Sequence, residues 1–168
     1  MVIIGGLTLN RRTNRNDNTL SDVELISPSS DNDECDPTDL NEEVAYHASV
    51  LSPDGKIVTC GGENKIGDHL SKCQIQTSTG ETRSYPSMIN IRYGFGMAII
   101  NGTIYAIGGQ NGFDRINKME SINIMTENQW KDELDMPFRV TGHCVVTIST
   151  KMVVIGGWGE GVSKVWFY

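Results

Sequence analysis

A pair of adjacent glycines recurs four times in this chain, each time after a run of apolar residues. The pairs are Gly5-Gly6, Gly61-Gly62, Gly108-Gly109 and Gly156-Gly157. Their first glycines are 56, 47 and 48 residues apart. A doublet at the end of a strand indicates close contact with neighbouring backbone, because glycine has no Cβ and adopts positive φ at little cost. The nearly constant spacing predicts a fold built from repeats.

The clearest copy of the repeat is residues 92–137, which predict four short strands that we label A to D. An apolar run at 96–100 leads to the turn Asn101-Gly102, which is a strong hairpin signal. A second run at 103–107 ends at the doublet, and a third lies at 119–124. A fourth strand then precedes a closing proline.

The same order of strands divides the whole chain into four units. The first interval between doublets is long because it contains two polar insertions, 10–18 and 27–39, whose Asn, Asp, Ser and Pro residues are typical of loops. Strand D of the first unit is only weakly indicated, between residues 35 and 44. The predicted units are strands B to D at 2–44, complete units at 45–90 and 91–137, and strands A to C at 138–168.

This unit resembles the kelch repeat. The resemblance rests on the doublet after an apolar strand, on Tyr105 just before its doublet, on the later Trp130, and on a closing Met-Pro before Arg. The first copy lacks the tryptophan, the second has Tyr85 in its place, and only the third has the tyrosine. The resemblance implies an all-β fold, a partial kelch-type β-propeller of about three and a half four-stranded antiparallel blades. It also implies that the doublet glycines, Tyr105 and Trp130 are structural residues.

The number of units bears on how the propeller closes. A ring needs roughly four to eight blades, so about three and a half do not make an ordinary one. We expect the chain to be a fragment of a larger propeller; the alternatives are that two copies complete a ring or that an open array of blades persists. Bare strand edges and blade faces favour association. We therefore also expect self-association through the incomplete edges.

Composition excludes some classes of partner. The formal net charge of −7 argues against general binding to nucleic acid or to anionic membranes, since both require a basic surface. No window approaches the roughly 18 apolar residues of a membrane span, and no secretory signal is visible at the start of the chain. We expect no nucleic-acid partner and no insertion into a membrane.

The residues that most often carry catalysis or bind metals have structural explanations here. His47 and His143 occupy the same place of two repeats, near the start of strand A, and His69 lies in a B–C loop. No HExxH, GxSxG or Walker pattern occurs. We expect no cofactor and no metal site, although a weak calcium site is an alternative reading of one acidic run, which otherwise indicates a solvated loop. That run is Asp31, Asp33, Glu34, Asp36 and Asp39.

Cys60 and Cys73 flank one B–C loop, and a hairpin folded about residues 65–68 would set them opposite each other. Opposed positions on paired strands bring Cβ atoms close enough for a disulfide. The alternative is two small buried thiols, which is the usual state of unpaired cysteines. A disulfide would favour an extracellular or lumenal protein and free thiols a cytoplasmic one, so the localisation stays open.

The B–C and D–A connections of a propeller blade lie at the same end, and loops on a rigid scaffold commonly carry recognition. We predict that this end binds a partner protein. For the two arginines of the D–A loops, which we take as matching repeat positions, the alternative role is to tie blades together. The predicted partner-binding residues are Arg92, Asn111, Phe113, Arg115 and Arg139.

The resulting functional hypothesis is a non-enzymatic protein-interaction module that binds an unidentified protein. The alternative is a fragment of an enzyme, because some kelch-like propellers belong to copper oxidases whose Tyr, His and Cys side chains form a radical site. No distinctive constellation of these residues is visible in the sequence. A third alternative is a truncated product without independent function.

Overall fold

The computed structural model describes residues 2–7, 19–25, 38–77, 79–126, 128–159 and 165–167. Side chains are described between Val44 and Gly159 and at Phe167. The insertion at 10–18, the acidic run up to Asp36 and the part of the last B–C loop after Gly159 lie outside the described residues.

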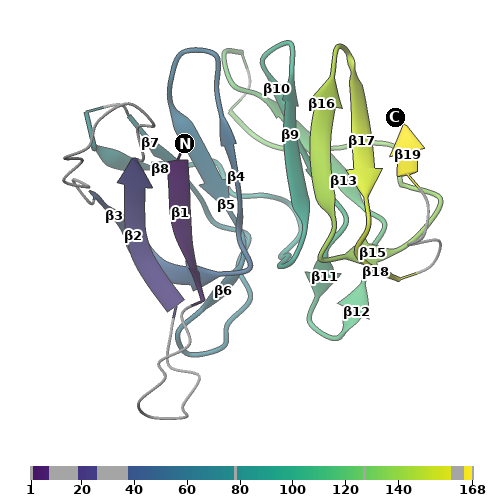
Figure 1. Ribbon diagram of the computed structural model, residues 1–168, viewed down its shortest axis with the longest axis horizontal. Coiled ribbons are helices and arrows are strands. Elements are labelled where there is room, and N and C mark those ends of the chain that lie inside the picture. Colours follow the sequence, from purple (N-terminus) through teal and green to yellow (C-terminus); the bar gives the residue numbers. More distant parts are fainter. Residues whose placement is uncertain are drawn as a thin grey trace, which may run out of the picture.

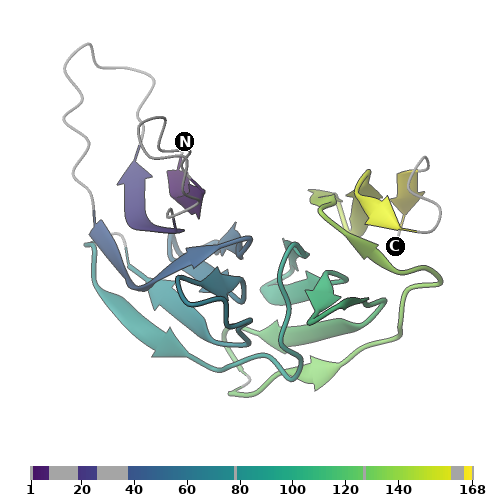
Figure 2. The same cartoon turned by 90° about the horizontal axis from the view of Figure 1, so that it is seen from below.

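Every regular element in the described residues is a β-strand, so the fold is all-β, as predicted. Four antiparallel sheets, blades 1 to 4, follow one another around an arc (Figure 1, Figure 2). Blade 2 consists of β4 (Ala48–Leu51), β5 (Ile57–Cys60), β7 (Cys73–Gln76) and β8 (Thr82–Tyr85). Blade 3 consists of β9 (Gly96–Ile100), β10 (Thr103–Ile107), β13 (Met119–Asn123) and β14 (Lys131–Asp132).

The two outer blades have three long strands each. Blade 1 consists of β1 (Val2–Leu7), β2 (Thr19–Leu25) and β3 (Thr38–Ala45), and blade 4 of β16 (Cys144–Ile148), β17 (Lys151–Ile155) and β19 (Val165–Phe167). The A strands β4, β9 and β16 contact one another in turn, so strand A lies on the inner side of the arc. The other strands are two-residue elements of the connections: β6 (Glu63–Asn64), β11 (Gln110–Asn111), β12 (Asp114–Arg115), β15 (Val140–Thr141) and β18 (Trp158–Gly159).

The Asn-Gly hairpin of blade 3 forms where the sequence predicts it. Ile100 and Thr103 are register partners across β9 and β10. Asn101 and Gly102 between them have φ of 50° and 75°. Positive φ at both central residues is what the type I′ turn requires, and its twist matches that of the flanking strands.

Two strand predictions differ from the structure, and one weakly indicated strand is confirmed. The first doublet lies inside β1, with a register irregularity between Ile4 and Gly6, and does not end the strand. The weakly indicated strand D of blade 1 is the eight-residue β3. Strand D of blade 3, expected to continue to Met136, stops after two residues. Beyond β14 the N–H of Glu133 donates to the carbonyl of Met119, and the N–H of Met136 donates to that of Asn117, just before strand C. Three residues on one side thus face two on the other, so regular antiparallel pairing does not continue.

Among the described side chains, which begin at Val44, the core consists of two apolar layers, each between neighbouring blades. In the layer between blades 2 and 3, Val58 and Ile104 are fully buried, and the Trp130 indole Nε1 donates to the Pro86 carbonyl at 2.8 Å. The layer between blades 3 and 4 includes Val154, which is also buried. Burial of each such aliphatic side chain contributes about 1.5–3 kcal/mol, so packing between blades stabilises the fold.

The second and third doublets end their strands beside the segment that leads into the next blade. Their φ values are 63° and 93° at Gly61-Gly62 and 59° and 96° at Gly108-Gly109. A Cβ on Gly61 would lie 2.5 Å from the Arg92 carbonyl oxygen, and one on Gly108 would lie 2.9 Å from that of Val140. The N–H groups of Gly62 and Gly109 donate to the same two carbonyls at 2.9 and 2.8 Å. Positive φ and this close hydrogen-bonded approach are the physical reason for the doublets.

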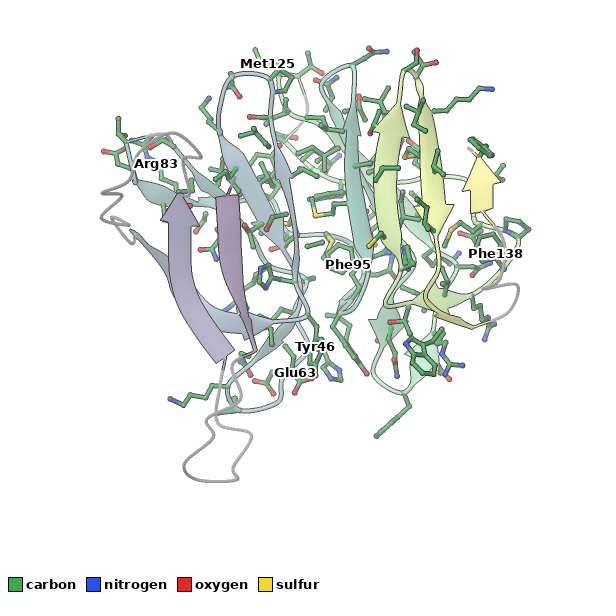
Figure 3. The ribbon with its side chains drawn as sticks, viewed as in Figure 1. Tyr46, Glu63, Arg83, Phe95, Met125 and Phe138 are labelled. Atoms are coloured by element: carbon green, nitrogen blue, oxygen red, sulfur yellow. A yellow bond between two sulfur atoms is a disulfide. The ribbon has the colours of Figure 1, made fainter. Side chains whose placement is uncertain are left out.

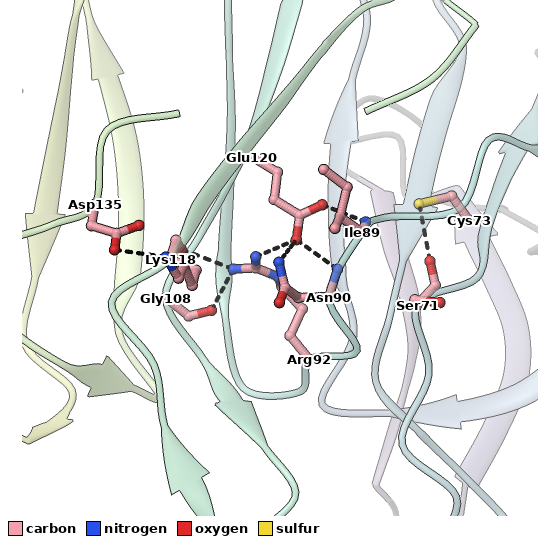
Figure 4. Close-up of polar contacts among 9 residues, drawn as sticks. All are labelled: Ser71, Cys73, Ile89, Asn90, Arg92, Gly108, Lys118, Glu120 and Asp135. Atoms are coloured by element: carbon pink, nitrogen blue, oxygen red, sulfur yellow. Dashed lines mark hydrogen bonds and ion pairs between the residues drawn. The ribbon is translucent and has the colours of Figure 1, made fainter. Parts of the chain in front are cut away.

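Arg92 is a buried structural residue, and this corrects its assignment to the partner surface. Its side chain is 0% exposed, and its Nη1 donates to the carbonyls of Gly108 at 2.7 Å and Lys118 at 3.0 Å (Figure 4). Its Nη2 forms an ion pair with the Glu120 carboxylate, which is also 0% exposed. Burial lowers the pKa of Arg92, and the Glu120 carboxylate opposes that shift.

The Glu120 carboxylate joins this network to the D–A connection between blades 2 and 3. It accepts the backbone N–H of Ile89 at 2.6 Å and that of Asn90 at 3.0 Å, and the Asn90 side-chain amide at 3.0 Å (Figure 4). The pair therefore connects the segment that leaves blade 2 to strands B and C of blade 3. A buried charge is tolerated where ion pairing and hydrogen bonds of this kind replace water.

The structure also shows that Arg92 and Arg139 are not at matching repeat positions. Gly142 corresponds to Gly94, since both have left-handed φ and both precede strand A by two residues. In that alignment Arg92 corresponds to Val140, whose carbonyl accepts the equivalent doublet hydrogen bond. Arg139 therefore corresponds to the residue before Arg92, and its side chain is exposed.

Cys60 and Cys73 are register partners on β5 and β7, with Cα atoms 4.1 Å apart, and the structure joins them in a disulfide. The Cys73 sulfur also lies 3.9 Å from the Ser71 carbonyl oxygen, a contact that is a hydrogen bond only in the thiol form (Figure 4). That the Cys60–Cys73 disulfide forms in the purified protein stays a prediction, and so does the extracellular or lumenal location that a disulfide would favour.

The doublet explanation is tested by alanine at Gly109, with Gly67→Ala as the matched control. Both glycines have similar positive φ, 96° and 88°, but only a Cβ on Gly109 meets atoms, with the Phe95 Cβ 2.6 Å away. We expect Gly109→Ala to lower the free energy of unfolding by about 1–3 kcal/mol more than Gly67→Ala, the difference being the steric cost. Denaturant unfolding measures both. Equal losses would mean that conformation alone explains the doublet.

The buried ion pair is tested by Arg92→Met, with the exposed Arg139→Met as control. Removing Arg92 leaves the Glu120 carboxylate buried without its cation, which we expect to cost about 3–5 kcal/mol of unfolding free energy. The exposed control is expected to change it by less than about 0.5 kcal/mol. The double variant Arg92→Met/Glu120→Met should lose less than the sum of its two single variants. A loss below about 1 kcal/mol for Arg92→Met would contradict this role.

Candidate partner-binding face

The B–C and D–A connections gather at one edge of the molecule, which we call the loop edge. It carries β6, β11, β12, β15 and β18, the lower elements in Figure 1. The A–B and C–D turns lie at the opposite edge, where Figure 3 labels Met125. This separation follows from the antiparallel order of each blade, in which successive connections alternate between the two ends.

A repeated backbone contact fixes the loop edge to the blades. In blades 3 and 4, the residue just before the left-handed glycine that precedes strand A (Gly94 or Gly142) pairs with the residue that follows the doublet of the same blade. Tyr93 and Gln110 exchange N–H to carbonyl hydrogen bonds of 3.1 and 2.9 Å, and Thr141 pairs with Trp158 at the equivalent place. The loop edge is therefore built on short ladders and is not a set of unattached loops.

A pocket of about 320 Å³ lies on the loop edge between blades 3 and 4. Three of the predicted partner-binding residues line it together. Its lining residues are Gln110, Phe113, Asp114, Arg115, Arg139 and Gly159.

The β11–β12 hairpin presents Phe113 at its tip with the side chain fully exposed, at 101%. The hairpin is short and anchored, because the Tyr93 hydroxyl donates to the Gly112 carbonyl at 3.0 Å. Arg115 is exposed on the same hairpin, and Arg139 is exposed in the neighbouring D–A connection. Within the described residues neither guanidinium takes part in an ion pair. The pocket thus combines an exposed ring with two cations that can accept a partner's anionic group.

The remaining sequence predictions are placed as follows. Asn111 lies on β11 beside the pocket without lining it, and Arg92 lies in the interior as described above. Sequence reasoning missed Trp158, which follows the last doublet directly and is 73% exposed on β18. A large aromatic residue in the polar loop after a doublet was the available signal.

In the part of the chain that the structure describes, no group of three His, Cys, Asp or Glu side chains is arranged to hold a metal ion. The described residues also contain no helix that is long and apolar enough to span a membrane.

Comparison with known proteins identifies the repeat. The family model of the Kelch motif matches residues 91–137. Kelch repeat and BTB domain-containing protein 2 of cowpox virus (strain Brighton Red) is 31% identical over 118 residues, which cover 70% of this chain and 21% of that protein. Kelch-like protein 7 of Rattus norvegicus is 35% identical over 102 residues, which cover 60% of this chain and 17% of that protein. The chain therefore spans about a fifth of the length of these curated relatives.

A solved structure agrees with the architecture. The structure of YjhT superposes with a TM-score of 0.76 over 93% of this chain and 55% of that chain, at 13% sequence identity. At that identity the similarity shows the fold alone.

His143 is packed between blades 3 and 4 and does not reach the pocket on the loop edge. It is 6% exposed, and its Cε1 lies 3.0 Å from the position that a Cβ on Gly108 would occupy. Neither ring nitrogen makes a hydrogen bond of good geometry. Burial lowers the pKa of His143 to about 4, against a smaller opposing contribution from the backbone of Ile107. The ring is thus held neutral, as a core residue.

The pH dependence of stability tests this placement of His143. Its pKa is about 4 in the fold and 6.5 ordinarily, so the unfolded chain takes up a proton first as the pH falls. The neutral ring therefore makes its full contribution to the free energy of unfolding above pH 6.5. As the pH falls to 4, the free energy of unfolding decreases by about 3 kcal/mol. We compare wild type with His143→Phe by denaturant unfolding from pH 7 to 4, because Phe95 occupies the same repeat place in blade 3. The variant is expected to lose less stability; parallel curves would show that His143 titrates normally.

Proposed function

Because the chain belongs to the kelch-repeat family, we propose that it is a non-enzymatic module that binds another protein through its loop edge. A propeller fold alone carries no function, since one fold hosts many. The observation that supports the proposal is the fully exposed Phe113, held on an anchored hairpin beside Arg115 and Arg139.

The composition of the pocket fits a protein partner. Aromatic residues and arginine are the types most enriched at the energetic centres of protein interfaces. Here Phe113, Arg115 and Arg139 surround one concave site, and Trp158 adds a second exposed ring on the neighbouring strand β18. The two cations favour a partner segment with a carboxylate next to an apolar side chain, because the guanidinium plane matches carboxylate geometry.

The outer face of blade 4 supports a separate proposal, association with a second copy of this chain. Val146, Ile148 and Ile155 are exposed on this face. The equivalent positions of blade 3 lie under blade 4, where Ala98 and Ile107 are buried at 4% and 1%. The face therefore has the apolar character of a surface that packs against another blade.

Partner binding is tested with the double variant Phe113→Ala/Arg115→Ala. The matched control is Met125→Ala/Arg83→Ala, which removes an exposed apolar side chain and an exposed arginine away from the loop edge (Figure 3). A partner captured by the wild-type chain and identified by mass spectrometry is purified, and its affinity for each variant is measured by calorimetry. We expect a loss of at least about tenfold for the loop-edge variant, or roughly 1.4 kcal/mol, and little change for the control. Equal affinities for wild type and the loop-edge variant would place the binding surface elsewhere.

A further inference from the structure

A second group of aromatic and charged residues lies on the loop edge between blades 2 and 3. The rings of Tyr46 and Tyr93 have centroids 6.2 Å apart at an angle of 56°. The His69 ring stacks on Tyr93 with centroids 4.3 Å apart, and its Nε2 lies 3.6 Å from the Glu63 carboxylate. Figure 3 shows Tyr46 and Glu63 together at this edge. We call these four residues the aromatic–acidic patch.

The backbone of Tyr46 shows that the fold does not require a tyrosine there. Tyr46 has φ of 55°, and the equivalent residues of the next blades are Gly94 at 59° and Gly142 at 65°. A hydrogen bond from each blade to the previous one needs this conformation: the Gly142 N–H donates to Gly94, and the Gly94 N–H donates to Tyr46. Glycine adopts left-handed φ freely, whereas a bulky side chain makes it costly.

The backbone conformation therefore does not explain why a tyrosine occupies this position. Tyr46 is 50% exposed, so its side chain contributes little to the core. A strained residue at an exposed position is a reason to consider function, because the surrounding structure must hold it in place. Its neighbour Tyr93 is anchored through its hydroxyl to Gly112, so the two rings are presented in a defined arrangement.

The patch combines one carboxylate, Glu63, with two tyrosine rings, and His69 lies between Glu63 and Tyr93. Tyrosine ring faces carry negative potential and attract cations. Burial raises the pKa of Tyr93, and the nearby Glu63 and Tyr46 raise it further, which agrees with a negative environment. The B–C connection of blade 2, which contains β6, has two carboxylates, Glu63 and Asp68, and one lysine, Lys65, whose side chain is exposed.

We propose that the aromatic–acidic patch binds a cationic side chain, lysine or arginine, of a protein partner. The cation sits against the exposed ring of Tyr46 and pairs with Glu63 beside His69, while the rings cover its aliphatic stem. The patch has the opposite charge preference to the pocket of Phe113, Arg115 and Arg139, so one partner can be held at both places in one orientation. The biological partner rests on the proposed function, but binding of the cation does not.

The direct test is a titration of the full chain with a lysine side-chain probe, followed by NMR of the tyrosine rings and the backbone. The probe is Nα-acetyl-lysine methylamide, and the neutral control is Nα-acetyl-norleucine methylamide, which has a similar aliphatic stem without the charge. We expect saturable shifts at Tyr46, Tyr93 and Glu63 with the lysine probe, and affinity about three- to fivefold weaker for the norleucine probe. Equal responses to the two probes, or no response at these residues, would overturn the proposal.

Two variants separate a binding role from a structural one. Tyr46→Gly is expected to hold or raise the midpoint of thermal unfolding, by up to about 2 °C, while the response to the lysine probe is lost. Glu63→Gln should reduce the probe's affinity, and the nearby exposed Ile66→Ala should leave it unchanged. A clear fall in the unfolding midpoint of Tyr46→Gly with unchanged probe binding would show that the tyrosine is structural and contradict the proposal.

The outcome is distinguishable from that of the partner test. Phe113→Ala/Arg115→Ala lies outside the patch and should bind the lysine probe as wild type does. If that variant also keeps its affinity for the captured partner, the proposed function fails while the cation site stands. If the lysine probe does not bind but Phe113→Ala/Arg115→Ala loses the partner, only the cation site fails.

Discussion

The hydrogen bond from the second glycine of a doublet to the segment that leads into the next blade is the contact on which the rest of this structure depends. Gly62 reaches the Arg92 carbonyl and Gly109 reaches that of Val140, each at a distance that leaves no room for a Cβ on the preceding glycine. Strand B of one blade is thereby joined to the beginning of strand A in the next. The same approach holds strand B of one blade beside the next blade, where the apolar side chains of the two blades pack together.

The same contact explains why the candidate binding residues come together. It lies where strand B ends and where the next blade begins, so the B–C loop and the neighbouring D–A connection are held side by side. Arg115 and Arg139 are distant in sequence and belong to different blades, yet they line one pocket. The ion pair of Arg92 and Glu120 adds to this in one blade, since it ties the segment before strand A to strands B and C. In blade 4 the residue equivalent to Arg92 is Val140, which is buried. The repeat therefore does not require an ion pair at this position, because an apolar side chain packs there instead.

The sequence predicts the repeating part of the fold well, because the repeat depends on short-range signals. Asn101-Gly102 predicts its hairpin from local backbone conformation, and the doublets predict where strands B end in blades 2 to 4. What the sequence does not reveal is the exact alignment of the connections. Arg92 and Arg139 each lie 31 residues after the first glycine of the preceding doublet, but strand A begins 35 residues after that glycine in blade 3 and 36 residues after it in blade 4. An error of one residue therefore interchanges a buried and an exposed position. That is why one of two similar arginines proves to be in the core.

The exposed chemistry of the site is harder to predict for a different reason. Phe113 and Trp158 lie in short connections where no periodic pattern distinguishes a ring that packs from one that faces water. Tyr46 is hidden by its context, because its sequence position reads as the beginning of an apolar strand. Its significance emerges only from comparison of equivalent backbone angles, which shows a tyrosine where Gly94 and Gly142 satisfy the same constraint without strain. Departures from the repeat at positions where the scaffold is strictly constrained are therefore more informative about function than the repeat itself. In this chain they lie on the edge that the doublets assemble.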